Sequence, residues 1–235
     1  MNSSELNGSE LNSTSLSSTA IAVFVKTPGL SPVKTRLAAS IGTPDAEHLY
    51  RLCVSAIEQT LLGATQDLSI SPFWAVGETA GLSNALWQGF ESIHTGDGGL
   101  GERQHHIYQT LQARYQRVIL VGADSPQLSV KLLKEAIKAL DKHTFAIGPA
   151  VDGGYYLFAG RAPVPKNIWT SVIYSAADTA EQLCAQLPSP AVELERITDV
   201  DTINDLKVLK SELLAETALS HKQEEIIRWI DKLEG

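Results

Sequence analysis

An aspartate follows an unbroken apolar run in the segment R-V-I-L-V-G-A-D-S-P-Q-L, residues 117–128. Residues Val118 to Val121 are typical of a strand covered on both faces, and Gly122 lets the chain bend outward after it. Asp124 would then lie at the carboxyl end of a buried strand, the edge at which open α/β sheets bind ligands. A carboxylate there suits a divalent metal and, through the metal, a phosphate. The alternative is an aspartate that only serves the turn.

Cations surround the turn that follows the first predicted strand, A-I-A-V-F-V-K at residues 20–26. Lys26 ends this strand, and Lys34 and Arg36 stand in K-T-R-L at an expected helix start. Free amides at a helix start, together with lysine and arginine, can bind phosphate oxygens. The spacing matches neither a Walker loop nor a G-x-G-x-x-G fingerprint. A solvated basic helix end is the alternative.

Residues 95–103, T-G-D-G-G-L-G-E-R, hold four glycines within six positions. Such a loop can bring backbone amides close to a ligand, and a helix is expected from Glu102 onward. Arg103 would then pair with a phosphate or a base. The alternative is a mobile connector, because glycine clusters also form simple turns.

Two other turns carry aspartates. Asp152 precedes Gly153 and Gly154, whose backbone can approach a ligand closely, so a functional aspartate is preferred over a plain hairpin turn. Asp199 and Asp201 stand just before an expected helix. They serve either as helix-start anions or as part of the same crevice as Asp124.

Apolar runs and helical patterns alternate along the chain, which predicts an α/β fold. Trp74 and Trp87 are expected in the core rather than on a binding platform. Strands are predicted at residues 20–26, 69–76, 90–94, 118–121, 143–150, 155–157 and 192–197. Helices are predicted at residues 43–62 and 224–233, and others are expected to begin at residue 102, at a Ser129 cap, at a Thr170 or Ser171 cap with its end at Leu187, and at residue 202.

Composition limits the class of protein. The chain has 235 residues and 43% hydrophobic residues, which predicts one domain over residues 20–235 after a disordered, Ser/Asn-rich tail at residues 1–19. The net charge of -8 argues against a nucleic-acid partner. Cys53 and Cys184 are expected to be buried and unbridged. No apolar run approaches the ~20 residues that span a bilayer, so a soluble, cytoplasmic protein is expected.

Taken together, these segments resemble a family of uncharacterised GT-A-type transferases, described as nucleotide-diphospho-sugar transferase-like and often associated with radical-SAM genes. The resemblance covers residue 20 to about residue 209. The chain departs from the family pattern at W-T-S, residues 169–171, and at Ile203, where proline is usual. The first loop is also similar to that of nucleotidyltransferases that guanylylate phospholactate. The motifs that carry the resemblance are F-V-K-T-P, V-K-T-R-L, G-L-G-E-R, G-A-D-S-P-Q-L, G-P-A-V-D-G-G-Y-Y-L and D-V-D-T.

The resemblance implies a Rossmann-like GT-A three-layer sandwich with a central mixed, mostly parallel sheet and a nucleotide held over its strand ends. Lys26, Lys34 and Arg36 would contact phosphates in such a site. Asp124 would match the acidic position that binds the metal, Mg²⁺ or Mn²⁺.

The leading hypothesis is a metal-dependent transferase that uses a nucleotide-activated donor, preferably a nucleotide-sugar glycosyltransferase acting on a small-molecule acceptor. Asp124 would bind the metal, and Asp152 would orient the acceptor or remove its proton. One alternative is a nucleotidyltransferase that joins a nucleoside triphosphate to a phosphorylated acceptor, with Asp201 as a second metal ligand. Another is a nucleotide-binding module without catalysis. The last helix, with Trp229, could pack on the domain or form a homodimer contact.

Overall fold

The computed structural model describes residues 19–234. The predicted disordered tail therefore lies, except for Thr19, outside the described residues.

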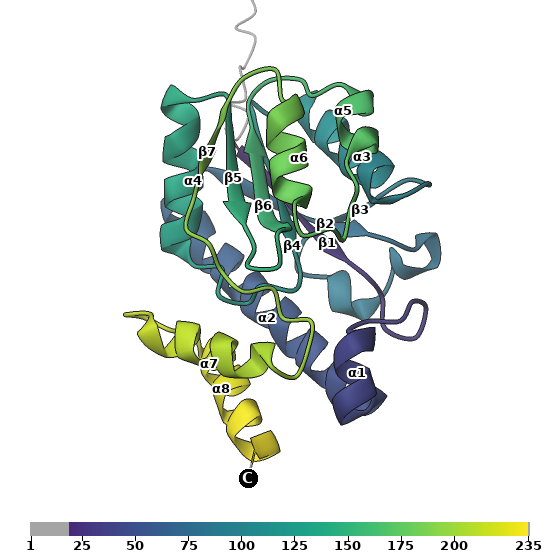
Figure 1. Ribbon diagram of the computed structural model, residues 1–235, viewed down its shortest axis with the longest axis vertical. Helices are drawn as coiled ribbons and strands as arrows, with labels where there is room; N and C mark the ends of the chain where they lie inside the picture. The colour runs from purple at the N-terminus through teal and green to yellow at the C-terminus, as the bar shows by residue number, and fades with distance from the viewer. Residues whose placement is uncertain (1–18, 235) are drawn as a thin grey trace, which may run out of the picture.

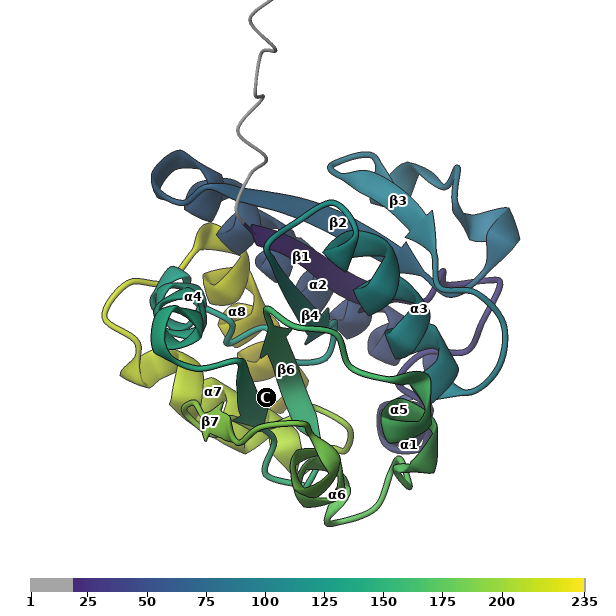
Figure 2. The ribbon, with the colours of Figure 1, turned by 90° about the horizontal axis from the view of Figure 1, so that it is seen from above.

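The described chain forms one seven-stranded sheet with the strand order β3-β2-β1-β4-β6-β5-β7 (Figure 2). Only β6 runs antiparallel to its neighbours among these strands. The strands are β1 (Thr19–Val25), β2 (Ile70–Val76), β3 (Glu91–His94), β4 (Arg117–Gly122), β5 (Phe145–Pro149), β6 (Tyr155–Gly160) and β7 (Ala191–Glu193).

Helices cover both faces of the sheet, which gives three layers (Figure 1). Side chains of α2 (Thr43–Asp67) and α4 (Val130–Lys142) fill the core on one face. Those of α3 (Leu100–Gln112), α5 (Lys166–Ser171) and α6 (Thr179–Gln186) fill the other. This arrangement confirms the predicted α/β class and the mixed, mostly parallel sheet.

The strands that carry the site are the most apolar ones. Val118 to Val121 in β4 are all at most 3% exposed, because helices cover the strand on both sides. After β4 the chain turns, and Ser129 caps α4 as predicted, its hydroxyl accepting a hydrogen bond from the Leu132 amide at 3.3 Å. Trp74 and Trp87 are buried against each other, which confirms their place in the core.

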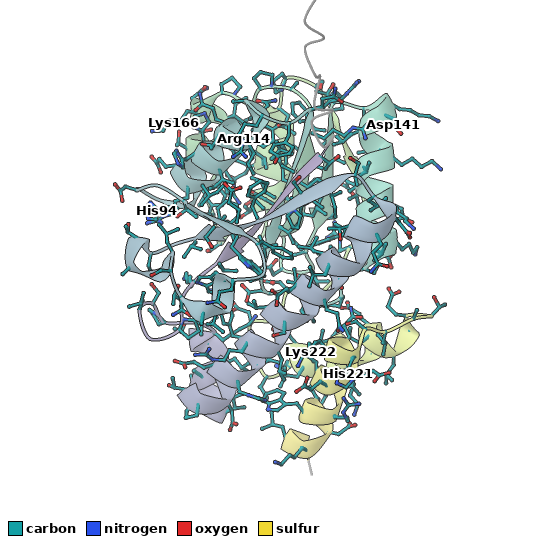
Figure 3. The ribbon with its side chains drawn as sticks, turned by 180° about the vertical axis from the view of Figure 1, so that it is seen from behind. His94, Arg114, Asp141, Lys166, His221 and Lys222 are labelled. Atoms are coloured by element: carbon teal, nitrogen blue, oxygen red, sulfur yellow. The ribbon has the colours of Figure 1, made fainter. Side chains whose placement is uncertain are left out.

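A third cluster of apolar side chains joins the first two helices of the chain to the last two. The helices α7 (Asp205–Ala215) and α8 (His221–Glu234) pack on α2 and on α1 (Thr35–Ile41), at one end of the sheet (Figure 1). Figure 3 shows the labelled Lys222 at the start of α8 beside α2, where its backbone amide donates to Gln59 Oε1 at 3.0 Å. The last helix thus packs on the domain, and Trp229 lies near His48 of α2.

Two predicted elements differ from the structure. The single helix predicted up to Leu187 is wrong, because the chain forms α5, a connection, and then α6. Thr170 lies inside α5, where its hydroxyl donates to the Lys166 carbonyl at 3.1 Å, so it caps nothing. Trp169 is fully buried against Tyr108 and Phe158, and this packing fixes α5 separately. The strand predicted at residues 192–197 is shorter, spanning only β7 and one isolated bridge.

The two cysteines are unbridged, as predicted. Cys53 is buried in the third cluster, and Cys184 is partly exposed. Among residues 19–234, no helix is both long and apolar enough to cross a membrane.

Gly153 provides a test of how the Asp152 turn is built. Its φ is +91°, and a Cβ at this position would lie 1.9 Å from the Ala177 carbonyl oxygen. Gly29 has a similar φ of +90° with open space around it. Gly29→Ala should therefore cost only the backbone strain, about 1 kcal/mol, whereas Gly153→Ala should cost about 2 kcal/mol or more. Urea denaturation of both variants measures this, and equal losses would contradict the close packing at Gly153.

Candidate functional site

A cavity of about 610 Å³ opens at the carboxyl edge of the sheet. It lies where the chain leaves β1 and β4, which are adjacent in the sheet. From β1 the chain adds β2 and then β3 on one side, whereas β4 lies on the other side of β1, so the order of the strands reverses at this point. Such a reversal leaves a crevice between the connecting loops. The strand ends contribute, in sheet order, Thr95 after β3, Gly77 after β2, Lys26 after β1, Asp124 after β4, Tyr155 at the start of β6 and Ala150 after β5.

Lys34 joins three loops at the floor of this cavity. Its side chain is only 2% exposed, and its Nζ lies 2.5 Å from Asp124 Oδ1 and donates to the Val200 carbonyl. Burial works to lower the pKa of Lys34, but attraction to Asp124 and nearby anionic groups outweighs it and the pKa is raised. The ammonium group therefore stays charged and holds Asp124 in place.

The backbone of Lys34 is also unusual. Its φ of 48° and ψ of 42° are left-handed, a conformation that few residues other than glycine adopt. The residue directly precedes α1, and this conformation accompanies the inward course of its side chain. Strained backbone of this kind is concentrated at functional sites.

Asp199 shares the cavity with Asp124. Burial, followed by repulsion from the Asp124 carboxylate, raises the pKa of Asp199 to about 7. The two segments are tied together, since the Val200 amide donates to the Asp124 carbonyl at 3.3 Å. The Ser125 hydroxyl lies 3.5 Å from Asp199 Oδ1. Asp124 and Asp199 are therefore two neighbouring acidic side chains on the lining of one cavity.

Arg36 and Asp201, which the sequence placed in the site, are not among the residues that line the cavity. They pair with each other on the surface, with 2.8 Å between Nη1 and Oδ2. Of Asp199 and Asp201, only Asp199 lines the cavity, whereas Asp201 pairs with Arg36. The sequence alone could not distinguish which of the two lines the cavity.

Arg103 holds the glycine-rich loop against the sheet. Its Nη1 donates to the Gly77 carbonyl at 3.0 Å and to the Thr95 hydroxyl at 2.6 Å, and its Nε donates to the Gly98 carbonyl at 3.0 Å. It lines the cavity, as does Lys26, whose side chain is exposed. Of the predicted cations, Lys26 is therefore the one most free to meet a ligand.

Asp152 also lines the cavity, from the turn between β5 and β6. Its Oδ1 accepts a hydrogen bond from the Gly154 amide at 2.9 Å, and the carboxylate is exposed. The structure thus brings together Lys26, Lys34, Arg103, Asp124 and Asp152 of the predicted residues, together with Asp199, one of the two aspartates for which a place in this crevice was an alternative.

A buried polar network that the sequence analysis missed supports the two central aspartates. Gln127 Nε2 donates to the Thr198 carbonyl at 2.9 Å and to Glu212 Oε2 at 2.5 Å. The Thr198 hydroxyl donates to Glu212 Oε1 at 2.7 Å. Because Gln127 follows Asp124 and Thr198 precedes Asp199, this network fixes the two segments side by side.

Within residues 19–234, no three His, Cys, Asp or Glu side chains lie close enough to hold a metal ion by themselves. Asp124 and Asp199 nevertheless fit a Mg²⁺ or Mn²⁺ ion that takes its remaining ligands from water and substrate phosphates, as Mg²⁺ commonly does. The raised pKa of Asp199 reflects burial first and repulsion from Asp124 second, and a bound cation would oppose both effects.

The pKa of Asp199 predicts a pH dependence of stability. Between pH 4 and 7 the folded state holds a proton on Asp199 that the unfolded state has lost, so the free energy of unfolding falls as pH rises through this window. Asp199→Asn should remove this slope and stabilise the protein at pH 8 by roughly 1 to 3 kcal/mol. Denaturant titrations at pH 4 to 8 measure the effect, with Asp201→Asn as the matched control. Parallel pH profiles for Asp199→Asn and the unaltered protein would contradict the assignment.

Comparison with known proteins finds one family model and a number of solved structures that are similar to this chain. Residues 61–176, just under half of the chain, match the model of a family described as "Uncharacterized protein conserved in bacteria (DUF2064)". That segment contains Arg103, Asp124 and Asp152. None of the curated proteins matches the chain.

Solved structures share the fold over most of the chain. A protein from Desulfovibrio desulfuricans G20, provisionally named a nucleotide-diphospho-sugar transferase, aligns with a TM-score of 0.75 and 28% identity over 92% of this chain and 96% of its own. Rv0371c from Mycobacterium tuberculosis H37Rv aligns with a TM-score of 0.53 and 17% identity over 82% and 97%. The 4-diphosphocytidyl-2C-methyl-D-erythritol synthase from Anaerococcus prevotii DSM 20548 aligns with a TM-score of 0.51 and 11% identity over 93% and 96%. Residues 61–176 are thus similar to the DUF2064 model, and the chain shares its fold with a provisionally named nucleotide-diphospho-sugar transferase.

Proposed function

We propose that this protein is a metal-dependent transferase that uses a nucleotide-activated donor, and that the donor is a nucleotide sugar. The observation that carries the proposal is the pairing of Asp124 and Asp199 in the middle of the cavity, with the Lys34 ammonium bound to Asp124. The likeness to the Desulfovibrio protein over nearly the whole chain supports the same class of substrate.

The lining residues have separate proposed roles in binding the donor. Asp124 and Asp199 would hold Mg²⁺ or Mn²⁺, which when bound neutralises charge on the diphosphate. Lys26 lies next to this pair on the β1 side and is free to contact phosphate oxygens. Lys34 positions Asp124, and Arg103 positions the glycine-rich loop, because the hydrogen bonds of both side chains are largely used within the protein.

Asp152 is placed to act on the acceptor. In the transfer, an acceptor hydroxyl oxygen bonds to the anomeric carbon of the sugar, the bond from that carbon to the diphosphate oxygen breaks, and the nucleoside diphosphate leaves with the electron pair. The exposed Asp152 carboxylate takes the hydroxyl proton or orients the hydroxyl, since its Oδ2 has no hydrogen-bond partner within residues 19–234.

The nature of the donor can be tested by thermal stability with nucleotide sugars and nucleoside triphosphates, each with and without Mg²⁺ or Mn²⁺. A ligand at a hundred times its Kd stabilises the folded state by about 2.7 kcal/mol, so binding raises the Tm. We expect a metal-dependent rise with a sugar nucleotide and release of a nucleoside diphosphate on turnover. A rise with a triphosphate alone, with pyrophosphate as product, would instead show nucleotidyl transfer.

Asp124→Asn tests the central role of that carboxylate. It keeps the size of the side chain but removes the charge that binds the metal, so turnover should fall about 100-fold or more. Asp201→Asn is the control, since Asp201 pairs with Arg36 outside the cavity lining, and it should leave turnover within about twofold. Unimpaired turnover in Asp124→Asn would refute the metal assignment.

A further inference from the structure

The two halves of the cavity differ in charge. The cationic side chains among its described lining residues are Lys26, Lys34 and Arg103, and they come from the β1–α1 connection and the start of α3. Glu78 also lines this half, and its carboxylate accepts a hydrogen bond from the Thr27 amide at 2.9 Å. On the other side of Asp124, the segments that lead into β6 and α6 contribute tyrosines, small residues and the acidic Asp152, but no cation. A phosphate bound on that side would have no cationic partner and would face Asp152.

Gln104 is the central polar residue on the side of the cavity that has no cation. It lies on α3, is 8% exposed and lines the cavity. Its Oε1 accepts from the Tyr155 hydroxyl at 2.6 Å and lies 3.1 Å from the Tyr174 hydroxyl oxygen. Its Nε2 has no hydrogen-bond partner within the described chain. The tyrosines therefore fix the amide with its oxygen occupied and its N–H donors available.

The surroundings of Gln104 are rigid. The Tyr174 hydroxyl also lies 2.9 Å from the Trp169 carbonyl oxygen, and a Cβ on Gly101 would come within 2.3 Å of that same oxygen, so α3 packs directly on α5. Burial, with the nearby Tyr174, raises the pKa of Tyr155 well above its ordinary value, so the Tyr155 hydroxyl keeps its proton. A donor held in this way needs little ordering when a ligand binds.

We infer that this half of the cavity binds the acceptor, and that the acceptor is an uncharged molecule whose hydroxyl or carbonyl oxygen accepts a hydrogen bond from Gln104 Nε2. The inference rests on the proposed function, in which the donor diphosphate takes the side with Lys26. Apolar side chains of Phe24, Leu100 and Leu120 also line the cavity and suit an acceptor without charge. Phosphorylated and carboxylated acceptors are disfavoured, since each would bring an anion to a side that has no cation.

The test compares matched probes on the full chain by ligand-observed NMR: glycerol with glycerol 3-phosphate, and glucose with glucose 6-phosphate. Each is measured with Mg²⁺ alone, with Mg²⁺ and UDP, and with Mg²⁺ and GDP. We expect the neutral member of a pair to bind at least about tenfold more tightly than its phosphate ester. Equal affinity, tighter binding of the ester, or no binding of any probe would overturn the inference.

Gln104→Glu tests the donor itself. The variant keeps the shape and an oxygen for the tyrosines, but it replaces the N–H donors with a second oxygen, so affinity for the neutral probe should fall about tenfold. Gln109→Glu adds the same charge to an exposed position of α3 and should change nothing. Equal effects of the two variants would refute the role of Gln104. If Gln104→Glu does not fold, the preference of the unaltered protein between the paired probes still decides the inference.

The two proposals fail in different ways. The Tm of the same samples reports whether UDP or GDP binds with Mg²⁺. A nucleotide-dependent rise together with a preference for the phosphate esters would leave the proposed function standing and refute the neutral acceptor. A preference for neutral probes that depends on Gln104, without a rise for any nucleotide in the thermal panel, would refute the nucleotide donor instead.

Discussion

The site depends on the buried contact between Lys34 and Asp124. Three segments distant in sequence meet there, because the Lys34 ammonium binds Asp124 after β4 and the Val200 carbonyl ahead of α7. Taking an ammonium group out of water is costly unless it is paired and fully hydrogen-bonded, so the loops cannot separate without exposing an unpaired charge. The contact thus holds Asp124 close to the segment that contains Asp199. The hydrogen bonds among Gln127, Thr198 and Glu212 hold the same two segments together.

Sheet topology explains why the two sides of the cavity differ in their lining residues. Parallel strands β3, β2, β1 and β4 deliver their carboxyl ends to one edge, and these ends carry the lysines and the central aspartate. Strand β6 runs the other way, so its amino end reaches the same edge and brings Tyr155 there. The change of strand direction beside β4 coincides with the change from a lining with cations to a lining without them. The proposed donor and acceptor sides follow from this change.

The sequence predicted the features that local pattern controls. An apolar run ending in glycine identified β4 and Asp124, and the Ser129 cap was readable because capping involves residues only three positions apart. Features that depend on tertiary contacts were missed. The break between α5 and α6 follows from the burial of Trp169, and the choice of Asp199 over Asp201 depends on tertiary contacts, since Asp201 pairs with Arg36 outside the cavity lining. The convergence of Gln104, Tyr155 and Tyr174 likewise joins residues up to 70 positions apart.

The central claim is that Asp124 and Asp199 form a metal-dependent diphosphate site. A crystal structure with Mn²⁺ and inorganic pyrophosphate tests it most directly, because pyrophosphate assumes nothing about base or sugar and manganese can be located by its anomalous scattering. We expect a manganese ion bound to both carboxylates, with the pyrophosphate on the side of Lys26. Manganese bound at Asp201, or pyrophosphate bound beside Gln104, would contradict it.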